Sequence, residues 1–248
     1  MEPDDRLVHH HGAAERFEDA VEARLAAAVE HAAPHVPGAV KPRLRGWLHA
    51  GTAPVALVAG IVLVVLSHGA AEIAATVIYT VTTVMLFSGS AVYHRGRWSP
   101  RTLGVLRRID HANIFLIIAG TYTPFAVLLL EGGSRAALLW IVWTGALLGV
   151  AFRVIWPHAP RWLIVPTYIA LGWVAVWFLP DFTRAGGVAV LVLLALGGVL
   201  YTLGGIVYAT KRPDPYPTWF GFHEVFHTLV VLAYLAQYAA VVIVVLRS

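Results

Sequence analysis

Two histidines, His223 and His227, lie four positions apart near the end of the chain. If this segment is helical, the spacing places both imidazoles on one helix face, where both can reach one metal ion. His94, from a distant part of the chain, could supply a third ligand. Three neutral imidazoles with one open position are typical of a catalytic zinc centre, in which the fourth ligand is water made acidic by the metal.

A hydroxyl and a carboxylate are expected beside these histidines. Ser90 precedes His94 by four residues, and Asp110 opens the third predicted membrane span. Asp110 could accept a hydrogen bond from the water or orient a ligand histidine, and Ser90 could donate to an oxyanion. Simpler readings stay open: Asp110 as a helix-start carboxylate paired with Arg107 or Arg108, and Ser90 as a small residue at a helix contact.

The segment from His223 to His227 also fits the H-E-x-x-H pattern of zinc proteases, in which Glu224 would be the general base. Asp110 competes with Glu224 for that role. A third reading treats the two histidines as interfacial residues that bond to backbone or headgroups. The remaining histidines near span ends have no partner at ligand spacing and are interpreted as structural; they are His49, His68, His111 and His158.

The composition is that of a membrane protein. Of 248 residues, 58% are hydrophobic and 13% are charged, and the mean hydropathy is +0.71. The absence of cysteine excludes disulfides and Cys-based zinc sites. A net charge of only +4 makes nucleic acid an improbable partner, so membrane lipids are the expected one.

Apolar runs of about 20 residues predict an all-α integral membrane fold with seven transmembrane helices, because a lone span satisfies its backbone polar groups internally only as a helix. The predicted spans are Trp47–Leu66, Ala71–Tyr93, Ile109–Leu130, Ala136–Ile155, Leu163–Leu179, Gly186–Tyr208 and Phe222–Leu246.

The distribution of basic residues between these spans predicts their orientation. One side carries Lys41, Arg43, Arg45, Arg95, Arg97, Arg101, Arg107, Arg108, Arg153, Arg161, Lys211 and Arg212, whereas the other carries Arg135, Arg184 and Arg247. The positive-inside rule therefore places the N-terminus in the cytoplasm and the C-terminus outside. The same rule gathers Ser90, His94, Asp110, His223 and His227 at the cytoplasmic face.

Two domains are expected: an acidic cytoplasmic tail over residues 1–40 and the transmembrane domain over residues 41–248. Within the tail, Phe17, Val21, Leu25 and Val29 recur every four residues, which indicates a short amphipathic helix. His9, His10 and His11 could hold a metal only weakly.

Several segments resemble the hemolysin III family, the bacterial branch of the progestin and adipoQ receptor group, to which the adiponectin receptors belong. They run from Lys41 to His49, Ser90 to His94, Asp110 to Pro124, Gly197 to Gly204 and His223 to His227. The resemblance implies seven helices in a bacterial cell membrane and a cytoplasmic-side zinc held by His94, His223 and His227, with Asp110 and Ser90 around its water.

The alkaline ceramidases are similar in this constellation, which points to zinc-dependent hydrolysis of a lipid amide and a role in membrane lipid homeostasis. Other functions stay open at this point. Zinc could be structural in a receptor-like membrane sensor, the H-E-x-x-H segment could serve an intramembrane metalloprotease, and the family name suggests a pore-forming cytolysin.

Overall fold

The apolar stretches fold as helices in the computed structural model, which describes residues 42–248. The helices are α2 (Trp47–Leu66), α3 (Ala70–Arg95), α4 (Pro100–Leu129), α5 (Gly132–Ile155), α6 (Arg161–Gly172), the 3-10 helix η1 (Trp173–Phe178), α7 (Leu179–Thr210) and α8 (Phe222–Val245). Residues 42–248 contain no strand, only an isolated bridge between Tyr216 and Phe220. The all-α prediction is confirmed for these residues. The predicted tail helix and the His9 to His11 cluster lie outside them.

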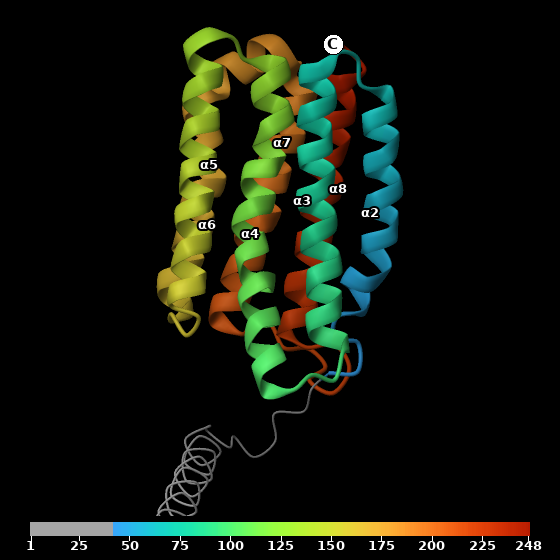
Figure 1. Ribbon diagram of the computed structural model, residues 1–248, viewed down its shortest axis with the longest axis vertical. Helices are drawn as coiled ribbons and strands as arrows, with labels where there is room; N and C mark the ends of the chain where they lie inside the picture. The colour runs from blue at the N-terminus through green and yellow to red at the C-terminus, as the bar shows by residue number, and fades with distance from the viewer. Residues whose placement is uncertain (1–41) are drawn as a thin grey trace, which may run out of the picture. The chain divides into compact units, whose positions relative to one another are not determined.

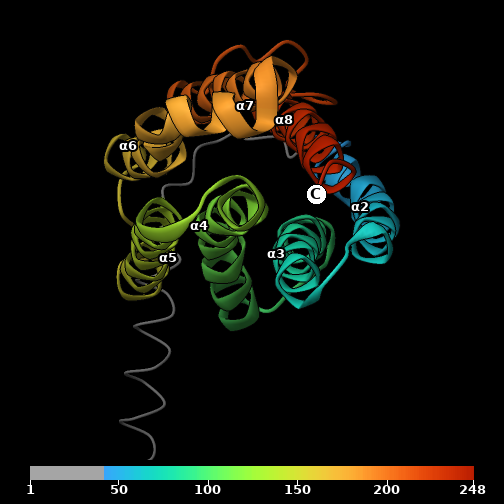
Figure 2. The ribbon, with the colours of Figure 1, turned by 90° about the horizontal axis from the view of Figure 1, so that it is seen from above.

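The helices stand upright beside one another (Figure 1) and surround a common centre when seen from above (Figure 2). Neighbours in sequence pack on each other, and α8 closes the ring by packing on α2. Large side chains such as Tyr79, Phe87 and Phe125 are buried inside, whereas Val65 and Ile155 are 75% and 82% exposed. An outer surface covered by large apolar side chains suits lipid, not water.

Six stretches of the described residues are long and apolar enough to cross a membrane, and one of them, Arg161–Thr210, has 50 residues. A straight helix of that length would extend about 75 Å. The chain instead folds back on itself: Arg161 near its start donates to the Tyr208 carbonyl near its end at 3.2 Å, and Gly187 adopts φ 76°, which favours glycine. This stretch contains both predicted spans 163–179 and 186–208.

Helix α4 begins nine residues before the predicted start at Ile109. Ser99 caps it by accepting a hydrogen bond from the Thr102 backbone N–H at 3.3 Å, and Pro100 occupies the first turn. Arg101, Arg107 and Arg108, which the sequence analysis assigned to a loop, are therefore helical. Asp110 lies about three turns inside α4, so its reading as a helix-start carboxylate is wrong.

Helices α3 and α4 approach closely at Gly120. A Cβ atom at this position would overlap the hydroxyl of Thr82 on α3. That hydroxyl is held in place because it donates to the Ile78 and Tyr79 carbonyls, at 2.9 and 3.1 Å. The contact packs α3, which carries Ser90 and His94, closely against α4, which carries Asp110.

We expect Gly120→Ala to lower the stability of the bundle by about 1–3 kcal/mol, the usual effect of overpacking. Gly104→Ala on the same helix is the matched control, because nothing lies within 4 Å of a Cβ there. Thermal unfolding of the purified protein in detergent measures both variants. Equal midpoints for Gly120→Ala and Gly104→Ala would contradict the close contact.

Candidate metal centre

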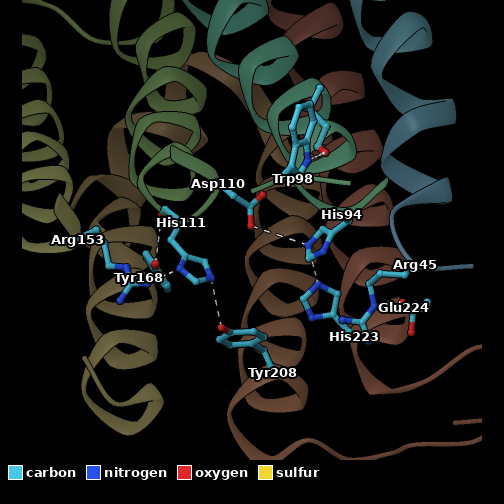
Figure 3. Close-up of polar contacts among 11 residues, drawn as sticks. Arg45, His94, Trp98, Asp110, His111, Arg153, Tyr168, Tyr208, His223 and Glu224 are labelled. Carbon is cyan, nitrogen blue, oxygen red and sulfur yellow. Dashed lines mark hydrogen bonds and ion pairs between the residues drawn. The ribbon is translucent and has the colours of Figure 1, made fainter. Parts of the chain in front are cut away.

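The first turn of α8 is fixed by Glu224. Its Oε2 accepts a hydrogen bond from the Gly221 backbone N–H at 2.9 Å, and its Oε1 lies 2.6 Å from Nε of Arg45. The side chain is only 1% exposed, and each of its carboxylate oxygens contacts a partner inside the protein. This pairing ties the first turn of α8, which carries His223, to the segment before α2 (Figure 3).

His94, at the end of α3, faces the two histidines of α8. Its Nε2 lies 3.0 Å from Nε2 of His223 (Figure 3). Each of His94, His223 and His227 offers one ring nitrogen, and these nitrogens all lie within 4.8 Å of one another. All three residues are buried. The helices thus bring together the three histidines that the spacing singled out.

The donor set fits a metal ion. Two imidazole nitrogens on a tetrahedral zinc lie roughly 3.3 Å apart, close to the spacing between His94 and His223. Nδ1 of His227 is buried without a hydrogen-bond partner, a costly state for a polar atom. A buried cluster of three histidines can therefore hold a metal ion at the junction of α3 and α8.

Asp110 and Ser90 lie beside the cluster. Oδ2 of Asp110 is 4.0 Å from Nε2 of His94 (Figure 3), and Ser90 lies on α3 one turn before His94. The two side chains are 9% and 2% exposed. A carboxylate and a hydroxyl are therefore buried at the same end of the bundle as the three imidazoles.

His49, for which the sequence predicted a structural role, belongs to the same surroundings. Its ring stacks on the His227 ring, with centroids 3.7 Å apart and planes 7° from parallel. Both of its ring nitrogens are buried without hydrogen-bond partners. His49 is outside the group of possible ligands, so what it contributes is the placement of the His227 ring. Nothing in its spacing from the other histidines predicted this contact.

A cavity of about 430 Å³ extends from the centre into the bundle. Ser90, Asp110, His223 and His227 line one part of it. Most of the remaining wall is apolar and comes from α4, α6 and α7, including Ile114, Ile117, Ile118, Val165, Ile169 and Leu194. A hollow of this size and character can take the hydrocarbon part of a small amphiphile.

Comparison with known proteins places the cluster within a matched region. A family model described as "Haemolysin-III related" matches residues 38–238. A hemolysin-3 homolog of Bacillus subtilis (strain 168) is 33% identical over 160 residues, 63% of this chain and 74% of that protein. Hemolysin-3 of Bacillus cereus is 34% identical over 157 residues, 61% of this chain and 70% of that protein.

We expect His223→Ala to weaken metal binding by more than the roughly 10–100-fold that loss of an outer-shell partner costs. His158→Ala is the control, because His158 is exposed and lies outside the cluster. Elemental analysis of the purified protein measures bound metal per chain. A full complement of metal in His223→Ala would remove this residue from the ligand set.

Proposed function

Because the chain belongs to the haemolysin-III related family, we propose that its histidine cluster holds zinc for the hydrolysis of a lipid amide in the bacterial cell membrane. One observation carries this proposal: two imidazoles of the buried cluster, those of His223 and His227, line a largely apolar cavity together with a carboxylate and a hydroxyl. A centre built only to join helices has no need of such a cavity. The chain itself is a multi-pass membrane protein.

The proposal includes seven crossings, with the N-terminus in the cytoplasm and the C-terminus outside. The fold-back of Arg161–Thr210 supports this count, since two antiparallel crossings account for its 50 residues. The excess of arginine near Arg45, Arg107 and Arg161 supports the orientation. The metal cluster then lies at the cytoplasmic end of the bundle.

His94, His223 and His227 would hold the zinc, which would supply a Lewis acid that polarises a carbonyl and makes water acidic. Asp110 then accepts the proton of the attacking water and returns it to the amine that leaves. Ser90 donates a hydrogen bond to the oxygen on which negative charge develops. The apolar cavity wall holds the acyl chain and excludes bulk water, which strengthens both interactions.

A structural metal in a sensor of membrane state is the second candidate function. One observation favours it: His94 and His223 lie on different helices and are 129 positions apart in the chain. A metal between them would join α3 to α8 whether or not a reaction occurs. For Glu224, burial and two engaged oxygens support a structural role, not that of a protease base.

Asp110→Asn separates these functions. We expect this variant to keep its metal and to hydrolyse a long-chain N-acyl lipid about 10²–10⁴-fold more slowly, the usual contribution of a general base. Release of fatty acid from the labelled lipid measures the rate, and elemental analysis measures the metal. Asp181→Asn, at the start of α7 and remote from the cluster, is the control.

Unchanged lipid turnover in Asp110→Asn, with metal lost only in His223→Ala, would favour the structural candidate. Glu224→Gln provides a further test, since its side-chain oxygen can still accept from Gly221. We expect it to retain turnover. Loss of turnover in a folded, metal-loaded Glu224→Gln protein would support the H-E-x-x-H reading.

The proposed orientation can be tested with single cysteines, because the natural chain has none. We expect a membrane-impermeant maleimide to label Ser248→Cys in intact spheroplasts and to leave Ser99→Cys unlabelled until the membrane is opened. Ser99 caps the start of α4, whereas Ser248 follows the end of α8. The two positions therefore test opposite ends of the bundle. The reverse labelling pattern would invert the proposed topology.

A further inference from the structure

Arg153 is a buried cation in the wall of the large cavity. The side chain lies near the end of α5 and is 3% exposed. Among residues 42–248, none of the carboxylates lies within 4.0 Å of its nitrogens, and its Nε has no hydrogen-bond partner. Asp110 lines the same cavity and attracts Arg153 over a longer distance, but its ion-pair contact within 4.0 Å is with His94. A guanidinium at this depth is costly unless an anion balances it.

The hydrogen bonds around Arg153 direct further donors into the cavity. Nη2 of Arg153 donates to Nδ1 of His111, so the ring proton of His111 must be on Nε2. That Nε2–H faces the Tyr208 hydroxyl oxygen at 3.4 Å (Figure 3). With its oxygen accepting from His111, Tyr208 keeps its own proton to donate elsewhere. The arrangement holds His111 neutral and presents donors to a ligand.

Two more arginines line the same cavity. Arg161 donates to the Tyr208 carbonyl at 3.2 Å and stacks over the Tyr208 ring, 4.5 Å from its centroid. Arg107 lines this cavity and also a second hollow of about 290 Å³, whose wall includes Arg161, His94 and His223. Within the described chain, neither arginine forms an ion pair with a carboxylate.

Every charged side chain in the wall of the second hollow is an arginine. Its wall contains Arg45, Arg107 and Arg161 but no acidic residue, and the charge of Arg45 is matched by Glu224 behind it. Arg107, His111, Arg161, Tyr208 and His223 line both hollows, which therefore adjoin at these side chains. Unmatched positive charge is thus concentrated between the metal cluster and the apolar part of the cavity.

We infer that this cavity binds a lipid with a phosphate headgroup, with the phosphate held by Arg107, Arg153 and Arg161 and the acyl chain in the apolar part. Guanidinium groups bind phosphate through paired hydrogen bonds. Three arginines that form no ion pair with a carboxylate of residues 42–248 suit a phosphate monoester, which carries up to two negative charges, better than a carboxylate with one. The inference names the substrate class for the proposed hydrolysis, but binding itself requires no turnover.

The test measures lipid binding to the full-length, metal-loaded protein by native mass spectrometry. We expect dioleoyl phosphatidic acid to bind at least about tenfold more tightly than dioleoylglycerol, which lacks the phosphate, and more tightly than oleic acid. Arg107→Gln and Arg161→Gln should each remove most of this preference. Arg108→Gln is the matched control, because Arg108 neighbours Arg107 on α4, carries the same charge and lines neither hollow.

Equal loss of affinity in Arg107→Gln and Arg108→Gln would overturn the inference, because it would indicate general surface attraction. Equal affinity for phosphatidic acid, dioleoylglycerol and oleic acid would also overturn it. A third measurement adds inorganic phosphate at millimolar concentration as a competitor of phosphatidic acid. Weak competition by phosphate supports a lipid headgroup. Binding of inorganic phosphate as tight as that of phosphatidic acid would show that the acyl chain contributes nothing, and would overturn the inference of a lipid ligand.

Asp110→Asn distinguishes this inference from the proposed function. Selective binding of phosphatidic acid to Asp110→Asn, with no lipid amide hydrolysed by the unaltered protein, would leave the inference standing and remove the hydrolase. Hydrolysis of an uncharged lipid amide without any preference for a phosphate group would leave the hydrolase standing and remove the phosphate-headgroup inference.

Discussion

A polar group at membrane depth must find its partner inside the protein, because hydrocarbon offers none. At the junction of α3 and α8 this constraint decides the arrangement. Glu224 is satisfied by Arg45 and Gly221, which fixes the first turn of α8 and directs His223 toward His94. Those contacts define where a metal ion can sit. The cavity, the Asp110 carboxylate and the arginines beside it are arranged around that junction.

The clustering of His94, His223 and His227 could be predicted from the sequence because it depends on two simple regularities. A separation of four residues places His223 and His227 on one face of any helix, and loop charge brings His94 to the same end of the bundle. Both regularities survive changes in the details of packing. The boundaries of most predicted spans were also close, since length and hydropathy determine them. Helix α4 was the exception, because its arginines suggested a loop although Ser99 and Pro100 form a helix-start signal.

The surroundings of the histidines were much harder to predict. The stacking of His49 on His227 depends on how α2 leans against α8, and helices that are apolar all round give no period from which to read it. The inward direction of Arg153 did have a signal. It continues the buried stripe of Leu138, Val142, Ala146 and Gly149 on α5, at spacings of three and four residues. Once that stripe is recognised, Arg153 must point into the bundle.

The length of α4 connects the centre to the thickness of the bilayer. Its 30 residues extend about 45 Å, whereas the hydrocarbon core measures about 30 Å. The excess length lies in the first turns, which carry Arg101, Arg107 and Arg108, and the apolar remainder is long enough to span the hydrocarbon. Asp110 lies where these two parts of α4 meet. The carboxylate that faces His94 therefore lies at the boundary between the polar turns and the apolar turns of one continuous helix.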